Sequence, residues 1–317
     1  MVMLAQTVLP FKLEATEERL TANAGLVLFG EFARGLGVGQ WIDGTLPAPG
    51  SGRGYAASRY VTPLVLMLTG GGRALEDLRE IADDRGLSHL LTDVNVPSTD
   101  AVGDWLRRMG AGAGLHELGK VCDRVTGVVL RHGDRTDHTL DIDASQIVAE
   151  KQEAKWTYKG EVGYMPMVGH LAEAGIVLAD EFREGNAAPG SNNLEFVRSC
   201  VQRMPRGHRI ARLRADSASY QAALFNWCEA EGIEFAIGAR HDEAAERAIA
   251  KIPADAWKQY TDCAIAETVH SMNETKKAFR MIVVKRQTQG ELFDELKIRC
   301  WRRPKTDPVI EDMPIQN

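Results

Sequence analysis

Two short acidic stretches hold the residues whose types and spacing could do chemistry. Residues 139–145, TLDIDAS, and residues 209–220, RIARLRADSASY, each alternate apolar and polar residues and then reach an aspartate, Asp143 and Asp216. Such alternation predicts a strand with one buried face. An acid at the exit of a buried strand contributes little to packing but can hold a hard cation through oxygen. Two such acids on neighbouring strands would form part of a two-metal phosphoryl-transfer site.

The same aspartates also have a purely structural interpretation. Asp143, in the sequence Asp-Ala-Ser, could be a solvated strand end or could cap the segment that follows. Asp216 could do the same with Ser217 as its local hydrogen-bonding partner. Asp141 lies two residues before Asp143 and therefore shares its strand face. It would add negative potential there, and it is the weaker candidate for a metal ligand.

Basic and aromatic residues are interleaved a few positions after the first acidic stretch. Lys151, Lys155 and Lys159 recur at every fourth residue beside Trp156 and Tyr158. This combination suits a phosphate backbone and a stacked base. A solvated hairpin edge, where lysine discourages strand pairing, explains the same pattern.

The densest cationic run leads directly into Asp216. Arginines in this run could hold substrate phosphates near an acidic site. The run consists of Arg203, Arg206, Arg209, Arg212 and Arg214. The candidate DNA-binding residues are Lys151, Lys155, Arg212 and Arg214.

Length, charge and cysteine content restrict the class of protein. A chain of 317 residues accommodates two domains, or one domain with a large insertion. The net charge of −6 excludes a protein that is basic throughout, so local patches must decide nucleic-acid binding. The five cysteines form no CxxC pair, which favours a reducing compartment over a zinc ribbon or a disulfide framework.

Neither a secretory signal nor a membrane span is predicted. The first residues, MVMLAQTVLP, have no basic region before an apolar core. The longest apolar run, residues 61–68, is too short to cross a bilayer. A cytoplasmic protein is expected.

Helical patterns fill the first part of the chain, about residues 14–133. Apolar residues recur there at spacings of three and four, and Ser98 or Thr99 is the predicted cap of one helix. That helix carries Arg107 and Arg108 on one face. Several short helices in series fit a DNA-reading helix-turn-helix module, and they fit a plain helical subdomain equally well.

Strand patterns begin at residue 135. The predicted order is a strand, two strands that pair as a hairpin (156–171 and 176–182), a helix, a strand, a helix and a strand. A further helix and two strands, residues 264–270 and 278–286, follow. This order predicts an α/β fold, a mixed sheet with helices packed on it.

At these residues the sequence resembles the DDE transposases of bacterial insertion sequences, in the branch whose catalytic domain carries a strand-rich insertion. The matching segments are the following stretches of this chain: 140–145, 151–153, 183–186, 214–220 and 232–240. The resemblance covers about residues 135–286, together with a helical N-terminal region of the expected kind.

The resemblance implies a ribonuclease-H-like mixed sheet with flanking helices and a partial strand-rich insertion, preceded by a helical N-terminal region. Residues 1–134 would form the helical DNA-binding region and residues 135–317 the catalytic domain. The family's catalytic triad is aspartate, aspartate and glutamate, so the first two acids fall on Asp143 and Asp216. We find no tyrosine–arginine–glutamate pattern for the third, and we therefore expect a chain truncated at its C-terminus that lacks the final glutamate helix and is inactive or incomplete.

The resemblance also implies cofactors and partners. Two Mg²⁺ or Mn²⁺ ions are expected, with Asp143 bridging both and Asp216 binding one. The DNA partners would be the terminal inverted repeats of an insertion sequence and its target, bound by a homodimer in a bacterial cytoplasm, on the nucleoid. Two alternatives stay open: a non-catalytic DNA-binding remnant, and an unrelated two-metal nuclease that takes its third carboxylate from Glu229, Glu267 or another acid.

Overall fold

The computed structural model describes residues 16–50, 52, 54–91, 95–286 and, for the backbone alone, 295–302. The chain divides into two compact units, Met1–Cys122 and Asp123–Asn317. Across the described residues, none of the helices has the length and apolar character that a membrane crossing requires.

The first unit is helical, as predicted, and its helices enclose a core of their own. Tyr60 and Trp105 stack within this core with ring centroids 5.0 Å apart. The last helix of the series continues past the end of the unit. The elements are α1 (Ala24–Gly35), α2 (Val38–Thr45), α3 (Ser58–Thr69), η1 (Leu75–Asp77), α4 (Leu78–Asp83), α5 (Arg85–Leu90), α6 (Thr99–Ala111) and α7 (Gly114–Arg131).

Local signals set several of these helix ends. Ser98 is the cap of α6, because its hydroxyl oxygen accepts a hydrogen bond from the Ala101 N–H at 3.3 Å. Helix α1 ends at Gly35, the first of three glycines at alternate positions, Gly35, Gly37 and Gly39. Of the two glycines that follow, only Gly37 has a left-handed backbone, with φ of 75°. Gly39 lies inside α2, a helix that the pattern did not predict.

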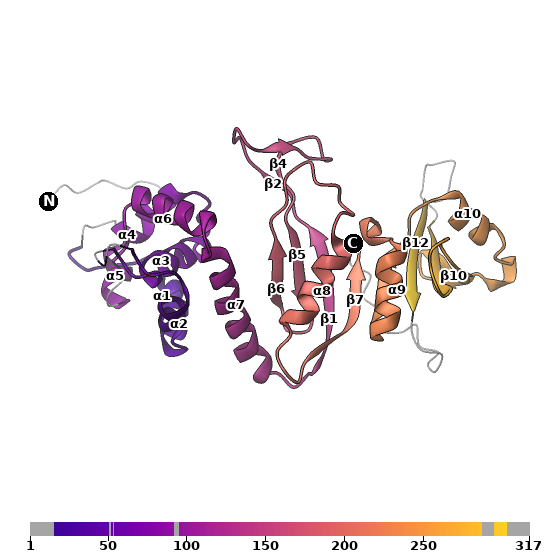
Figure 1. Ribbon diagram of the computed structural model, residues 1–317, viewed down its shortest axis with the longest axis horizontal. Coiled ribbons are helices and arrows are strands. Elements are labelled where there is room, and N and C mark those ends of the chain that lie inside the picture. The colour runs from indigo at the N-terminus through magenta and orange to yellow at the C-terminus, as the bar shows by residue number, and fades with distance from the viewer. Residues whose placement is uncertain (1–15, 51, 53, 92–94, 287–294, 303–317) are drawn as a thin grey trace, which may run out of the picture. The chain divides into compact units, whose positions relative to one another are not determined.

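The second unit is built on a nine-stranded sheet in the order β6-β5-β1-β7-β8-β12-β11-β10-β9 (Figure 1). Strand β1 (Asp137–Ala144) pairs antiparallel with β5 (Met167–Leu171) and parallel with β7 (Arg209–Ala215). Strand β6 (Ile176–Glu181) forms a hairpin with β5, and β8 (Glu234–Gly238) runs parallel to β7. Three antiparallel strands followed by two parallel ones confirm the predicted ribonuclease-H-like sheet.

The strands after β8 extend the same sheet. Strand β12 (Glu295–Arg302) pairs antiparallel with both β8 and β11 (Phe279–Arg286). Strands β10 (Cys263–His270) and β9 (Lys258–Tyr260) complete the edge. The strand-rich segment is therefore a continuation of the central sheet in the described residues.

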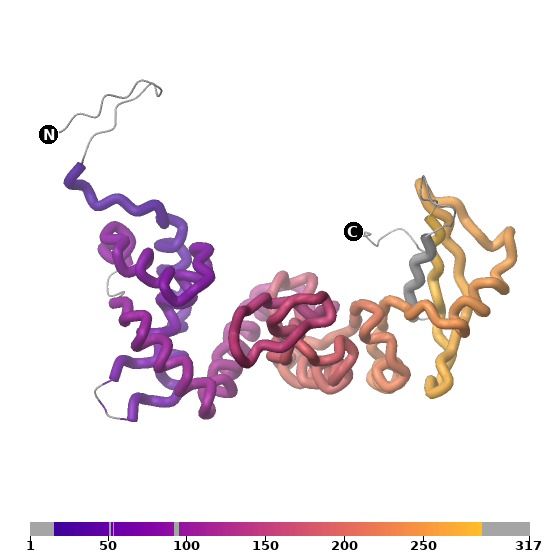
Figure 2. Tube along the Cα trace, turned by 90° about the horizontal axis from the view of Figure 1, so that it is seen from above, coloured from indigo at the N-terminus to yellow at the C-terminus, as the bar shows by residue number. Residues whose placement is uncertain are grey.

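A separate three-stranded sheet stands beyond the carboxyl end of β1 (Figures 1 and 2). Its order is β2-β4-β3, formed by β2 (Ile147–Val148), β3 (Lys155–Trp156) and β4 (Val162–Tyr164). The prediction of one continuous strand over residues 156–171 was wrong. A tight turn, closed by the Thr157 N–H on the Glu161 carbonyl at 2.8 Å, breaks the run. We call this element the small sheet.

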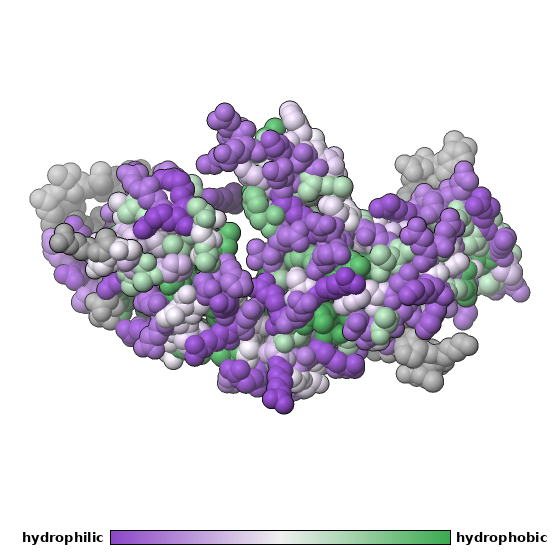
Figure 3. All heavy atoms as spheres, in the orientation of Figure 1, coloured by the Kyte–Doolittle hydropathy of each residue, from purple (hydrophilic) through white to green (hydrophobic). Residues whose placement is uncertain are grey.

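Helices α8 (Asn193–Arg203), α9 (Ala222–Glu231) and α10 (Glu243–Ala250) pack on one face of the large sheet (Figure 1). Leu140 and Ile142 of β1 are buried in that core with Leu213 of β7. Each such side chain contributes about 1.5–3 kcal/mol by leaving water. Hydrophilic residues cover most of the outside of this face (Figure 3). Residues of β1 that alternate with the buried ones, including Asp141 and Asp143, lie on the opposite face.

Candidate active site

The two predicted acids lie at the carboxyl ends of adjacent parallel strands. Ile142 of β1 and Ala215 of β7 are partners in the register, so Asp143 and Asp216 are the next residues on each strand. Neighbouring strands are about 4.8 Å apart. The two carboxylates therefore come from adjacent positions at one edge of the sheet.

The backbone around Asp216 is held in a tight turn. The short 3-10 helix η2 (Ser217–Ser219) follows directly, and the Ala218 N–H donates to Asp216 Oδ1 at 3.0 Å. Gly238, at the end of β8, lies against this turn. A Cβ on Gly238 would lie 2.9 Å from the Ser217 nitrogen, so a larger residue there would displace the turn that carries Asp216.

A buried polar chain supports the same turn from inside the protein. Arg183 Nη1 donates to Asn193 Oδ1 at 3.1 Å, and Asn193 Nδ2 donates to Ser219 Oγ at 2.9 Å. All three residues are buried. Removing one member would leave buried donors or acceptors without partners, which costs about 1–3 kcal/mol. This chain fixes η2 to the start of α8.

The two acids influence each other electrostatically. Burial is the largest cause that raises the pKa of the Asp216 carboxyl, and the neighbouring Asp143 raises it further. The Ala218 N–H and the positive charge of Arg240 act in the opposite direction. As whole residues both aspartates are exposed, but Asp216 lines a cleft whose walls remove water from its carboxyl. The net direction is upward, as expected where two carboxylates share a site.

The neighbouring acid on the same strand is in a different environment. Asp141 accepts two hydrogen bonds from Arg214, from Nε and Nη2, each at 2.5 Å. The pair lies in register across β1 and β7. Hydrogen bonding to Asp141 raises the pKa of Arg214. Asp141 is thus satisfied within the protein.

The predicted DNA-binding arginines both lie on β7 and both have acidic neighbours. Arg214 binds Asp141, and Arg212 lies 3.7 Å from Glu173 and 3.6 Å from Glu234. The pairs with Asp141 and Glu234 link β7 to its neighbours β1 and β8, whereas Glu173 lies in the turn between β5 and β6. A role for Arg212 and Arg214 in DNA binding stays a prediction.

The predicted DNA-binding lysines belong to the small sheet and its approach. Lys155 is an exposed residue of β3, and Lys151 is exposed in the preceding turn. Gln146, three residues after Asp143, donates to Thr157 Oγ1 at 2.9 Å. This bond ties the small sheet to the chain that leaves β1, close to the candidate acids.

An open cleft of about 560 Å³ lies beside Asp216. It is lined by Tyr158, Ala188, Pro189, Gly190, Asp216, Ser217, Ala218, Gln221 and Arg240. Sequence reasoning did not assign a role to Arg240, which follows the third parallel strand, β8. The rule that the carboxyl ends of parallel strands share one edge would have placed Arg240 there beside Asp143 and Asp216.

A third carboxylate does not complete the site among the described residues, which contain no group of three or more histidine, cysteine, aspartate or glutamate side chains able to hold a metal ion. Asp180 of β6 is in the same register row as Asp143, through Val168, but two strands away, roughly 10 Å. Glu229 pairs with Lys277. Glu267, on β10 and four strands from β7, pairs with Arg280 of β11. The structure brings neither glutamate to Asp216.

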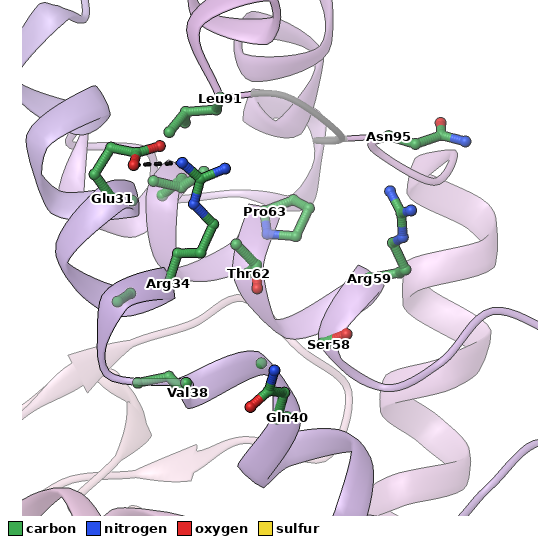
Figure 4. A pocket seen from close by; sticks show the side chains of 15 residues that line it. Glu31, Arg34, Val38, Gln40, Ser58, Arg59, Thr62, Pro63, Leu91 and Asn95 are labelled. Carbon is green, nitrogen blue, oxygen red and sulfur yellow. Dashed lines mark hydrogen bonds and ion pairs between the residues drawn. The ribbon is translucent and has the colours of Figure 1, made fainter.

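The helical unit contains a cavity of its own, about 290 Å³ in volume (Figure 4). Pro63, Leu66 and Leu91 contribute apolar walls, and Arg34 and Arg59 also line it. Arg34 Nη2 binds Glu31 Oε2 at 2.5 Å. This cavity belongs to the unit that the sequence assigned to DNA binding.

The strand order is that of a ribonuclease-H-like sheet, and the two acids lie at its carboxyl edge. The chain belongs to the family Transposase DDE domain group 1, which it matches over residues 7–294. This confirms the resemblance to DDE transposases. Divalent-metal dependence is a property of that family.

Two solved transposase structures are similar to this chain. One is the cryo-EM structure of the piggyBac transposase synaptic complex with hairpin DNA, with 10% identity, a TM-score of 0.46, and coverage of 90% of this chain and 62% of that one. The other is the crystal structure of the Mos1 mariner paired end complex with Mn, with 12% identity, a TM-score of 0.24, and coverage of 73% and 85%. This chain thus spans less than two thirds of the piggyBac chain. No match was found among curated proteins.

Proposed function

We propose that this protein is a DNA transposase that cleaves phosphodiester bonds at the ends of an insertion sequence and joins the freed strand to target DNA. Family membership supports the reaction class. The observation that carries the assignment to residues is the adjacency of Asp143 and Asp216 at one edge of the sheet. Burial, and then the neighbouring Asp143, raise the pKa of Asp216. Asp143 and Asp216 are the proposed catalytic acids.

The residues present fit a divalent metal ion. Two carboxylates on adjacent strand ends supply the hard oxygen ligands that Mg²⁺ and Mn²⁺ prefer. Their mutual repulsion would be relieved by a bound cation, whereas Asp141 already has a cationic partner in Arg214. When bound, two such ions would stabilise the attacking and leaving oxygens of an in-line displacement. Asp143 would bridge them, and Asp216 would bind one.

The rest of the chain would hold and orient DNA. Lys151 and Lys155 are exposed near the acidic edge and would contact phosphates. Arg212 and Arg214 would contribute positive charge on the outer face of β7, in addition to their ion pairs. The helical unit would read the terminal inverted repeats. A homodimer on two ends, in a bacterial cytoplasm on the nucleoid, is the proposed assembly and location.

An assay of cleavage and joining tests this function. Duplexes that carry the terminal repeats flanking this reading frame would be incubated with the full chain and Mg²⁺ or Mn²⁺. A complete transposase would cleave at the repeat boundary and join the end to plasmid DNA, both abolished by a chelator, whereas the truncated, inactive chain that the sequence predicts would do neither. Equal cleavage of a scrambled duplex would instead indicate a general two-metal nuclease.

A second candidate is a DNA-binding protein that does not complete the reaction. It is favoured by the lack of a third clustered ligand among the residues that the structure describes. In the same assay this protein would protect the repeats in footprinting without cutting them. Asp143→Ala would then leave its DNA affinity unchanged.

A further inference from the structure

We propose that the cleft between Tyr158 and Arg240 holds an unpaired nucleotide of the DNA strand, next to the phosphate that meets Asp143 and Asp216. This inference rests on the proposed function and adds the form of the substrate to it. The cleft volume of about 560 Å³ is within the range of about 300–1,000 Å³ that small-molecule sites occupy.

Arg240 gives the cleft a phosphate-binding wall. Its Nε donates to the Ser217 carbonyl at 3.4 Å, which places the guanidinium directly beside the turn that carries Asp216. A guanidinium has five N–H donors in a planar fork that matches phosphate oxygens. The cation therefore lies where the backbone of a strand entering the acidic edge would pass.

Tyr158 gives the cleft an aromatic surface. The residue is 60% exposed, a large fraction for an aromatic residue that lines a cleft. Lys159 Nζ lies 5.8 Å from the centre of the ring. The Gln146–Thr157 hydrogen bond fixes the residue immediately before Tyr158. An aromatic face held beside a cation is suited to stack on a nucleobase and neutralise its phosphate.

The base of the cleft is firmly built. Gln221 Nε2 donates to the Gly190 carbonyl at 2.5 Å and to the Ala218 carbonyl at 3.2 Å, so it joins the loop before α8 to η2. A Cβ on Gly190 would lie 2.8 Å from the Ala218 oxygen, which makes this close approach specific to glycine. The cleft is thus a preformed site beside Asp216.

The shape of the site selects an unpaired nucleotide. Inside a duplex both faces of each base are covered by its neighbours, and reaching a protein pocket requires unstacking. A strand that is opened next to the cleavage point offers a free base face to Tyr158 and its phosphate to Arg240. A fully paired duplex offers only the phosphate.

Binding measurements on the full chain without added metal test the proposal. The probes are a blunt duplex, the same duplex with a short single-stranded tail, and that duplex with abasic sites in the tail, each followed by fluorescence anisotropy. The wild-type chain should prefer the tailed duplex over the other two by about tenfold, because base stacking on an aromatic side chain is the added contact. Equal affinity for all three would overturn the proposal.

Matched variants separate stacking from phosphate binding and from folding. Tyr158→Ala should abolish the preference for the tail and Tyr158→Phe should retain it, since both faces of the ring survive in phenylalanine. Arg240→Gln should weaken binding to the tailed and the abasic probes alike and reduce the salt dependence by about one phosphate contact. A preference that survives Tyr158→Ala, or is lost equally in Tyr158→Phe, counts against the stacking role.

The cleft assignment and the proposed transposase function can fail independently of each other. If the chain prefers the tail but neither cleaves nor joins DNA with Mg²⁺, the cleft is a single-strand site and the transposase function fails. If the chain cleaves repeat ends without preferring the tail, the function stands and the cleft assignment fails.

Discussion

Along β1 and β7, Asp137 lies opposite Arg209 and Asp141 lies opposite Arg214, whereas at the carboxyl end Asp143 lies beside another acid, Asp216. The same pair of strands therefore contains two regions with opposite electrostatics. In the first region each aspartate is matched by an arginine across the strand pair. In the second, two aspartates repel each other.

The difference separates structural acids from candidate metal ligands. Hydrogen bonding from Arg209 is the largest cause that lowers the pKa of Asp137, whereas burial and the neighbouring Asp143 raise the pKa of Asp216. A protein gains nothing in stability by placing two carboxylates together. At one end of the strand pair each aspartate has an arginine partner, whereas at the other end two carboxylates repel each other unless a cation binds. This contrast points to cation binding between Asp143 and Asp216.

Loss of one of the two adjacent acids, Asp143 or Asp216, should have the largest effect on activity. Asp143→Asn should reduce DNA cleavage by at least about 1,000-fold, because a metal ligand supplies several kcal/mol of transition-state stabilisation and each 1.36 kcal/mol is a factor of ten. Asp141→Asn is the matched control on the same strand face and should stay within about tenfold of wild type. Single-turnover cleavage of labelled repeat ends measures both. Equal losses in the two variants would remove the distinction between the regions.

Metal binding should stabilise the folded chain through Asp143 and Asp216 alone. With Mg²⁺ at about 100 times its dissociation constant, linkage predicts about 2.7 kcal/mol of stabilisation, or roughly 5–10 °C in Tm. Asp143→Asn and Asp216→Asn should abolish this shift, and Asp141→Asn should preserve it. Differential scanning fluorimetry with Mg²⁺ and with a chelator provides the measurement. A shift that persists in Asp216→Asn would place the ion elsewhere.

The sequence predicted the two acids because each is a local event, an alternating run that ends in aspartate. It also predicted the mixed sheet and the strands β1, β6, β7, β8, β10 and β11. The pairing of Arg214 with Asp141 could not be predicted, because it depends on the register between strands more than seventy residues apart in the chain. The cationic run into Asp216 consequently suggested DNA contacts, where the fold uses Arg212 and Arg214 in ion pairs as well.

Two further features around the site were also not predicted from the sequence. The break after Trp156 was missed, because the apolar alternation continues through the turn. Backbone hydrogen bonds close that turn, from the Thr157 N–H to the Glu161 carbonyl and from the Gly160 N–H to the Thr157 carbonyl. Arg240 carried no local signal. Its position matters only because β8 ends beside β7, which is a property of the assembled sheet.

Disrupting a matched pair should reduce stability by a moderate amount. Arg214→Ala leaves Asp141 without its bidentate partner on a partly exposed face, which should cost about 1 kcal/mol, the upper end for exposed ion pairs. Arg206→Ala, an exposed arginine in the same run, should change stability by less than about 0.5 kcal/mol. Urea unfolding of both variants checks this. If the two cost the same, the Asp141–Arg214 pair does not stabilise the sheet.

The smallest expected effect is a difference in pH dependence between the two regions. The folded-state pKa of Asp216 is raised, so its contribution to stability is present below the unfolded value of about 3.9 and is lost as the pH rises through the folded value. Asp137 behaves in the opposite sense. Its folded-state pKa is lowered, so its contribution is present above about 3.9 and is lost as the pH falls through the folded value.

Asparagine variants convert these signs into measurable slopes. With a chelator present, Asp216→Asn should gain stability relative to wild type as the pH rises from about 4, because the variant no longer has to ionise a carboxyl beside Asp143. As the pH rises toward 4, Asp137→Asn should lose stability relative to wild type, because only the wild type gains the pairing with Arg209. Denaturant unfolding at a series of pH values gives both differences. Slopes of the same sign would mean that the two ends of β1 and β7 hold their acids in equivalent surroundings, and the electrostatic reason for placing a cation between Asp143 and Asp216 would be gone.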